Sequence, residues 1–155
     1  MFCGISTHSV DAKARVFVPK RIQDGLTPTA TGGRQGYLTP GEDSCLYLFP
    51  VEGFRAAAAE LNTRVFTTDE ARAAKRLFFG SSVPVELDSS GRILLPEDLR
   101  TWIGLEKEVV IVGVEDRAEL WPVQAWQAYR GKHANVLGKL NRIARDPSVP
   151  PTPAT

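Results

Sequence analysis

The sequence predicts an α+β, β-rich fold: two tandem repeats forming one pseudo-twofold β-barrel, with linking and flanking helices. The stretches "VDAKARVFVP" at 10–19 and "LDSSGRILLP" at 87–96 share one pattern at an offset of 77 residues. "LFP" at 48–50 and "LWP" at 120–122 continue the repeat at an offset of 72. Short alternating apolar runs between turn residues predict strands in both copies.

Each repeat begins with the same expected elements. A short strand, at about 6–10 or 83–87, leads through a polar turn, "DAKA" or "DSSG", to an alternating strand, "RVFV" or "RILL". Pro19 and Pro96 suit the first turn of a helix, where the missing N–H costs nothing. Gly25 stands where the first of these helices should stop.

Two further strands and a second helix complete each repeat. The first repeat should form strands at about 36–39 and 45–49, and the second should form them from "VVIVGV" and "AELW". Pro50 and Pro122 then open the second helices.

One repeat by itself is too small to bury its sheet, because about four short strands and a one-turn helix leave both faces open. If the hairpins of the two repeats interleave, their alternating apolar side chains meet in one interior and the sheet edges close into a barrel. The residues expected in that interior are Val16, Val18, Ile93 and Leu95.

The chain divides into four predicted regions. Residues 1–55 and 81–127 are the two repeats, 56–80 form a helical linker, and 128–155 form a basic helical segment with a disordered, Pro-rich tail.

Two local features interrupt this scheme. "LTPTATGGRQG" at 26–36 is rich in turn formers and has no periodicity, which predicts a flexible surface loop. Thr67, with Glu70 three residues later, predicts a capping box at the start of the linker's second helix.

The composition is that of one globular domain with a modest core, 43% hydrophobic and 24% charged over 155 residues. The longest apolar run is far shorter than the roughly 20 residues of a membrane helix, and the N-terminal sequence has no basic leader. Neither histidine has a Cys or His within four residues, and the two cysteines stand alone. We expect reduced thiols, no metal, no cofactor and a cytoplasmic protein.

A net charge of only +1 hides an uneven distribution of charges along the chain. Residues 1–40 carry a net charge of +3, residues 84–120 one of −5, and residues 127–146 one of +4. The near-neutral total therefore contains two basic regions.

The repeated Asp-x-x-x-Arg motif has two interpretations. As architecture, an Asp at the start of a turn accepts backbone N–H bonds, and the Arg at its end reaches back to that carboxylate. As a binding site, two hairpins place their arginines on one rim, facing a phosphate backbone or base edges. More cations surround the first motif, so we expect the main nucleic-acid contact there. The candidate DNA-binding residues are Lys13, Arg15, Lys20, Arg21 and Arg92, and the structural turn residues are Asp11 and Asp88.

Two enzyme interpretations are weak. Asp11 and Asp88 resemble an aspartic-protease dyad, but Lys13 stands where such a site needs small residues. Gly80-Ser81 resembles the cleavage site of a self-cleaving decarboxylase, but such a pair at a helix end is more often a plain stop. We therefore expect no catalytic residues.

A series of motifs in fixed order covers roughly residues 1 to 130. It comprises Met1, Phe2, Gly4, His8, Asp11, Lys13 and Arg15, followed by "CLYLFP", "AKRLFFGSS", "ELDSSGRILLP" and "IGLEKEVVIVG". This series resembles the MraZ family, bacterial transcriptional regulators built from two SpoVT-AbrB-type swapped-hairpin repeats.

The resemblance implies a sequence-specific DNA-binding protein that recognises short direct repeats upstream of its own operon, a cluster of cell-division and cell-wall genes. Similar proteins form ring-shaped homo-oligomers, which implies that several subunits engage successive repeats at the nucleoid. The expected partners are double-stranded DNA and further copies of the chain. The family's Asp-x-x-x-Arg motifs correspond to Asp11 with Arg15 and to Asp88 with Arg92.

Ala14 departs from the family, which usually has glycine at this position. If the turn needs a positive φ, the Cβ of Ala14 strains it; otherwise the turn is of another type or its tip is reshaped.

Arg34 and the basic tail either touch DNA or are solvated. Two other functions stay open: a DNA-binding antitoxin with a toxin partner, and a scaffold without a DNA role, for which the acidic second half is the best evidence.

Overall fold

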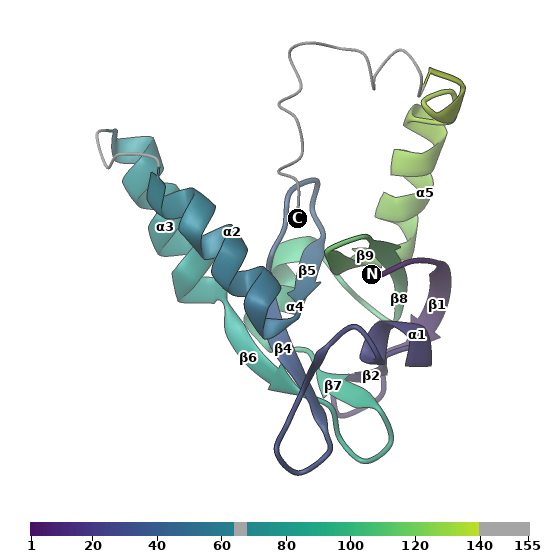
Figure 1. The fold of residues 1–155 in the computed structure, drawn as a ribbon. Coiled ribbons are helices and arrows are strands. Elements are labelled where there is room, and N and C mark those ends of the chain that lie inside the picture. The colour runs from purple at the N-terminus through teal and green to yellow at the C-terminus, as the bar shows by residue number, and fades with distance from the viewer. Residues whose placement is uncertain (64–67, 140–155) are drawn as a thin grey trace.

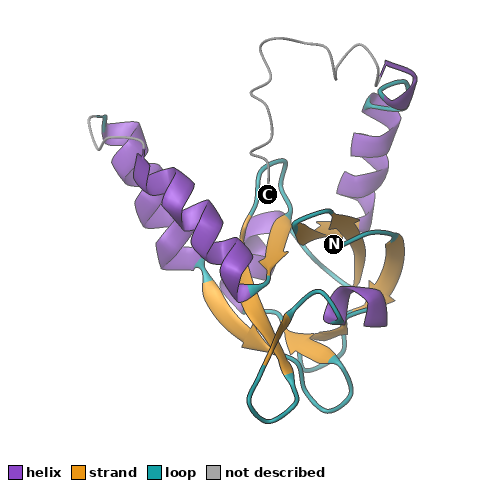
Figure 2. Ribbon diagram, in the orientation of Figure 1, coloured by secondary structure: helices purple, strands orange, loops and turns teal. Residues whose placement is uncertain are grey.

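The computed structural model describes residues 1–63 and 68–139. The first part of the chain forms β1 (Ile5–Ser9), β2 (Arg15–Phe17), α1 (Lys20–Gln23), β3 (Thr27–Pro28), β4 (Arg34–Pro40), β5 (Leu46–Phe49) and α2 (Val51–Thr63). The second part forms α3 (Asp69–Ser81), β6 (Val83–Glu86), β7 (Arg92–Leu94), α4 (Glu97–Ile103), β8 (Glu108–Val114), β9 (Arg117–Pro122), α5 (Val123–Lys132) and a 3-10 helix, η1 (Leu137–Lys139). The mixed, strand-rich α+β class is confirmed (Figure 1, Figure 2).

The strands form an open antiparallel sheet and not a closed barrel. Six strands follow in the order β1-β8-β9-β5-β4-β3, and β6 pairs with β4 off this path. β2 and β7 form a separate two-stranded ribbon. Within the described part of the chain β1 does not pair with β6, so the expected barrel closure is wrong. The reason is that β1 and β6 each continue through a turn into the ribbon.

Strands of the two repeats pair with each other at four places. β1 pairs with β8 and, at the equivalent place, β6 pairs with β4. β2 pairs with β7 about Val16 and Ile93, and β5 pairs with β9 about Tyr47 and Glu119. Each central pair joins equivalent positions of the two repeats, at the sequence offsets of 77 and 72. A pseudo-twofold axis therefore passes through both pairs.

The main core contains the four residues expected there. Val16, Val18 and Ile93 are fully buried, and Leu95 is 1% exposed. Apolar side chains of α1, α4, β4, β5, β8 and β9 join them in one cluster. The ribbon therefore contributes one face to the same core that the large sheet covers.

A second apolar cluster lies beneath α5. It consists of Cys45, Val110, Val112 and Trp121, with Trp126 of α5 packed against it. Successive residues of a strand point to opposite faces. The apolar run of β8 is thus explained, because alternate side chains of this strand enter the two clusters.

Proline stands one position earlier than expected at three helices. Pro19, Pro96 and Pro122 are N-caps with ψ between 140° and 145°, and each helix begins at the next residue. Proline still costs little there, because an N-cap lies before the first helical hydrogen bonds.

Gly25 does not end α1 through a left-handed conformation. The C-cap of α1 is Asp24, in the right-handed helical region. A Cβ at Gly25 would lie 2.6 Å from the ring of Phe2, so this glycine allows close packing. In the second repeat, Gly104 does end α4 with a φ of 63°.

Residues 26–36 contain a short hairpin and are not wholly a loop. β3 pairs with the first two residues of β4, and Leu26 just before it is buried. The expectation of a plain surface loop is wrong because the turn formers occupy only the tip of the hairpin. There Gly32 adopts a φ of 84°.

α2 and α3 form an arm that projects from the sheet (Figure 1). The ring of Phe54 in α2 stacks on Tyr37 of β4, with centroids 4.1 Å apart. The same ring stacks on Phe78 of α3, with centroids 5.9 Å apart. Aromatic contacts therefore fix the base of the arm on β4.

Thr67, the expected N-cap of the linker's second helix, lies outside the described residues. The N-cap of α3 is Thr68, whose hydroxyl accepts a hydrogen bond from the N–H of Ala71. Glu70 is then the second helical residue, one position too early for the expected capping box.

None of the helices described is long and apolar enough to cross a membrane. Over 1–63 and 68–139, no group of three or more His, Cys, Asp or Glu side chains is placed to hold a metal ion. Cys3 is exposed, Cys45 is buried, and both are free thiols.

Candidate nucleic-acid interface

The first Asp-x-x-x-Arg motif forms a hydrogen-bonded turn between β1 and β2. Oδ1 of Asp11 accepts the backbone N–H groups of Lys13 and Arg15, each at 2.9 Å. Oδ2 of Asp11 accepts Nε–H of Arg15 at 3.1 Å. The backbone of Ala14 also donates to the carbonyl of Asp11. One carboxylate therefore closes the turn and fixes the direction of the Arg15 side chain.

The second motif repeats this geometry between β6 and β7. Oδ1 of Asp88 accepts the N–H groups of Ser90 and Arg92, each at 2.9 Å. Oδ2 of Asp88 accepts Nε–H of Arg92, also at 2.9 Å. The two copies are therefore equivalent in structure as well as in sequence.

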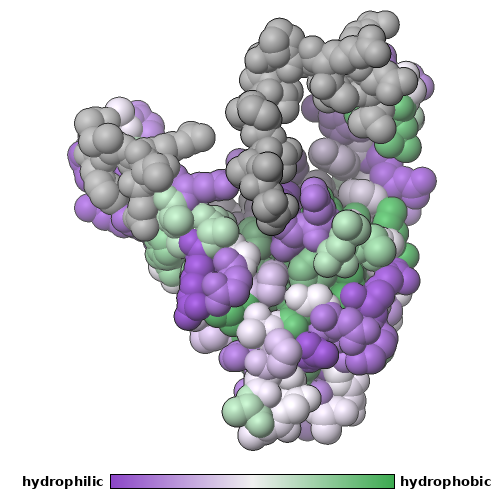
Figure 3. All heavy atoms as spheres, in the orientation of Figure 1, coloured by the Kyte–Doolittle hydropathy of each residue, from purple (hydrophilic) through white to green (hydrophobic). Residues whose placement is uncertain are grey.

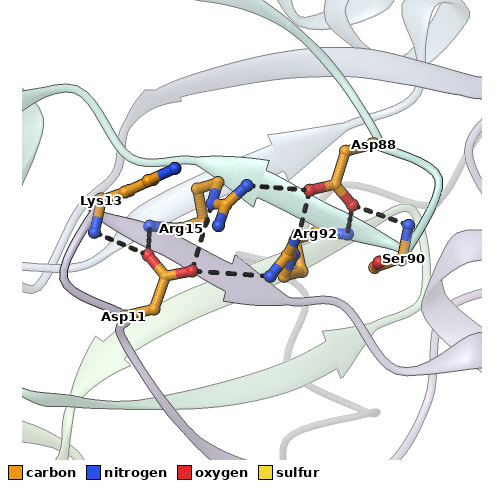
Figure 4. A network of polar contacts seen from close by, with 6 residues as sticks. All are labelled: Asp11, Lys13, Arg15, Asp88, Ser90 and Arg92. Atoms are coloured by element: carbon orange, nitrogen blue, oxygen red, sulfur yellow. Dashed lines mark hydrogen bonds and ion pairs between the residues drawn. The ribbon is translucent and has the colours of Figure 1, made fainter.

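The two motifs meet across the ribbon in one network of charges (Figure 4). Nη1 of Arg15 lies 3.7 Å from Oδ2 of Asp88, and Nη1 of Arg92 lies 3.7 Å from Oδ2 of Asp11. Antiparallel pairing of β2 with β7 brings the two motifs together although they are 77 residues apart in sequence. Each arginine thus contacts both carboxylates.

The carboxylates of this network are stabilised in the ionised form. The backbone N–H of Arg15 is the main cause that lowers the pKa of Asp11, and that of Arg92 is the main cause for Asp88. A dyad that shares a proton needs one raised pKa, so both shifts have the opposite direction. Because two carboxylates face two guanidinium groups, the network as a whole carries no net charge.

Ala14 has the backbone conformation of a glycine. Its φ is 59°, and the equivalent Gly91 has a φ of 73°. The first turn is therefore of the same type as the second, and the Cβ of Ala14 occupies the left-handed region at a cost.

The other predicted cations lie beside the ribbon. Lys13 is exposed, and within the described residues its ammonium forms no ion pair. On α1, Lys20 pairs with Asp24 at 2.7 Å, and Arg21 is exposed. Figure 3 shows hydrophilic side chains gathered where Figure 1 places α1.

His8 of β1 is close enough to Arg21 for the charge of Arg21 to affect its pKa. Burial is the main cause that lowers the pKa of His8, and the charge of Arg21 lowers it further. Its ring lies 5.6 Å from that of Phe17. His8 is therefore neutral at physiological pH and adds no positive charge.

α1 and the second turn border a polar pocket of about 420 Å³. Lys20, Gln23 and Arg34 line it together with Asp88. Arg34 is half-buried, and its guanidinium donates to the carbonyl of Leu26. Arg34 therefore has a structural role in the hairpin of β3 and β4. This hairpin lies next to the second motif, because Arg34 and Asp88 line the same pocket.

Two apolar residues of the ribbon, Phe17 and Leu94, were not among the predicted site residues. Phe17 is 42% exposed and Leu94 is 57% exposed, although both follow fully buried neighbours. Strict alternation in "RVF" and "RIL" was a signal for them, because residues next to a buried strand position face the other side.

Comparison with known proteins gives consistent matches over most of the chain. A family model for the MraZ protein, described as antitoxin-like, matches residues 1–77 and again residues 78–142. Two successive matches agree with the repeat that the sequence contains.

Three relatives carry the name transcriptional regulator MraZ. The protein of Pelotomaculum thermopropionicum is 42% identical over 135 residues, which cover 87% of this chain and 89% of the relative. That of Acetivibrio thermocellus is 42% identical over 131 residues, covering 84% and 87%. That of Symbiobacterium thermophilum is 41% identical over 126 residues, covering 81% and 87%.

Proposed function

Because the chain belongs to the MraZ family of transcriptional regulators, we propose that it binds duplex DNA sequence-specifically through the ribbon of β2 and β7 and through α1. The proposed target is a set of direct repeats upstream of its own operon of cell-division and cell-wall genes. The observation that carries this proposal is the pairing of both Asp-x-x-x-Arg motifs on one ribbon with exposed cations beside it.

The arginines of the network and the cations around it have different proposed roles. Arg15 and Arg92 are held by carboxylates, so their remaining N–H donors are oriented before DNA arrives, as bidentate recognition of guanine requires. Lys13, Lys20 and Arg21 stand outside the neutral network and attract the phosphate backbone. Specificity would then come from the network and most of the affinity from its surroundings.

A ring-shaped homo-oligomer would bring several ribbons to successive repeats. Linking binding sites converts the second contact into an intramolecular event, which multiplies affinity without new contacts. This assembly and a location in the cytoplasm at the nucleoid are part of the proposal.

The swapped-hairpin arrangement and the division into repeats 1–55 and 81–127, linker 56–80 and tail 128–155 belong to the same proposal. Their support is that each repeat pairs its strands with the other at four places. The proposal includes no enzymatic activity and no cofactor.

An antitoxin is the second candidate, because the matching family model is described as antitoxin-like. It predicts a small toxin that co-purifies with this chain and changes its DNA binding. A scaffold, the third possibility, predicts no preference for any DNA sequence.

The test is a salt titration of binding to the duplex upstream of the protein's own gene, beside a scrambled duplex. We expect affinity to fall with salt by a slope of about 0.9 per phosphate contacted and to stay higher for the upstream duplex. Equal affinity for both duplexes at every salt concentration would contradict specific binding.

Three substitutions separate the proposed roles in that titration. Arg15→Ala should cost the upstream duplex about 1–3 kcal/mol of binding free energy, and Arg92→Ala less, since Glu97 and Asp98 follow the second motif. Lys13→Ala should weaken binding to both duplexes and reduce the salt slope by about 1. An unchanged affinity and slope for Arg15→Ala would show that the first motif is not the main contact.

A further inference from the structure

The outward face of the ribbon carries two apolar side chains and two arginines in alternating positions. In the register of β2 and β7, Leu94 lies opposite Arg15, and Phe17 lies opposite Arg92. Residues directly opposite each other in an antiparallel pair point to the same face, with Cβ atoms about 5 Å apart. The central pair, Val16 and Ile93, points to the core and is fully buried.

Both apolar side chains are exposed, although each follows a fully buried residue of its strand. Phe17 is 42% exposed and Leu94 is 57% exposed, beside charged groups. Phe17 is nevertheless held in place, because its ring lies 5.6 Å from that of His8. A Cβ added at Gly91 would meet the same ring at 3.3 Å.

The surroundings of this face fit duplex DNA better than an apolar partner. Arginines of the network flank both side chains, and the exposed cations Lys13 and Lys20 lie beyond. A two-stranded ribbon also fits the major groove, which is about 12 Å wide. In that groove the apolar group that marks sequence is the C5-methyl group of thymine.

We propose that Phe17 and Leu94 contact thymine methyl groups in the major groove, next to the bases that Arg92 and Arg15 read. This inference rests on the proposed DNA binding and adds two residues that determine specificity. Because Phe and Leu differ in size at equivalent positions, the two halves of the contacted site are read unequally.

The test removes the methyl groups and leaves base pairing unchanged. The upstream duplex is made once with thymine and once with deoxyuridine at every thymine position, and the affinity of the wild-type protein is measured for both. We expect the deoxyuridine duplex to bind about fifteen-fold more weakly, because each buried methyl group contributes roughly a four-fold change.

Three variants show which residues cause the difference in affinity between the thymine and deoxyuridine duplexes. In Phe17→Ala and in Leu94→Ala the ratio of affinities for the two duplexes should fall to about four-fold, and in the double variant to about one. Leu77→Ala is the matched control, because Leu77 is 54% exposed on α3, outside the ribbon. It should keep the wild-type ratio.

The outcomes separate this inference from the proposed function. If the wild type prefers the upstream duplex over a scrambled one but binds the thymine and deoxyuridine forms equally, the methyl contact is refuted and DNA recognition stands. A ratio that persists in the double variant refutes it as well, because the effect then lies in DNA shape. If no preference over the scrambled duplex exists, both proposals fail.

Discussion

At the residue scale, Ala14 has a backbone conformation that favours glycine. A left-handed φ of 59° costs a non-glycine residue about 1–2 kcal/mol. Ala14→Gly should therefore raise the free energy of unfolding by about 0.5–1 kcal/mol, because the larger entropy loss of glycine offsets part of the gain. Denaturant unfolding measures this difference.

Ala12→Gly is the matched control in the same turn. Ala12 has no positive φ, so the substitution removes no strain and should slightly lower stability. The reverse change, Gly91→Ala, should also destabilise, because the new Cβ would lie 2.4 Å from Nε2 of Gln23. Equal losses in Ala14→Gly and Ala12→Gly would show that the conformation of Ala14 carries no strain.

The carboxylates of the network predict how stability depends on pH. The folded state lowers the pKa of Asp11 and of Asp88, mainly through backbone N–H bonds. Their contribution is therefore complete above the unfolded pKa of about 3.9 and is lost as pH falls through the lower folded pKa. Thermal unfolding between pH 7 and pH 2 should show a decrease in Tm below about pH 4.

The double variant Asp11→Asn, Asp88→Asn isolates that contribution. It should have a lower Tm at pH 7 and a smaller decrease in Tm on acidification. Asp43→Asn is the control, because Asp43 is exposed and asparagine tolerates its positive φ of 58°. A wild-type pH profile in the double variant would mean that these carboxylates are not coupled to folding.

At the element scale, an ion pair within β9 packs against β5. Glu119 is almost fully buried; its carboxylate accepts Nη2–H of Arg117 and Nε1–H of Trp121, each at 2.9 Å. The guanidinium of Arg117 also lies 4.3 Å from the ring centroid of Tyr47 on β5. The contact spans the central pair on the pseudo-twofold axis.

Glu119→Gln should lower the free energy of unfolding by about 1–3 kcal/mol, because it leaves the half-buried Arg117 with only the exposed Asp116 as a counter-ion. Urea unfolding followed by tryptophan fluorescence reports it, since Trp121 lies in the same contact. Glu106→Gln, at an exposed position, should change stability by less than about 0.5 kcal/mol. A similarly small effect at Glu119 would show that the pair is not stabilising.

Most elements were predictable because their signals are local. Alternation identified the strands of both repeats, and proline identified the approximate starts of α1, α4 and α5. β3 was missed because two residues among turn formers have no periodicity, and their pairing depends on β4. The N-cap of α3 was one position wrong because two adjacent threonines give the same signal.

At the scale of the whole molecule, each repeat needs the other's strand edges. Residues 81–139 alone should be unfolded as a monomer, because β6, β7 and β9 lose their partners β4, β2 and β5. Circular dichroism with analytical ultracentrifugation tests this. We expect a cooperative transition only where the fragment self-associates or is mixed with residues 1–80; a cooperative transition in the monomer would contradict it.

The sequence alone predicted the doubled unit, four of its core residues and, as one of two interpretations, the local bonding of each Asp-x-x-x-Arg turn. These depend on neighbours within ten residues or on apolar alternation, so the order of residues specifies them. Only the tertiary structure decided that the sheet stays open, that Arg15 also contacts Asp88, and that Phe17 and Leu94 share a face with the arginines. The physical reason is that these contacts join segments about 77 residues apart, and pairing register is set by packing across the whole core.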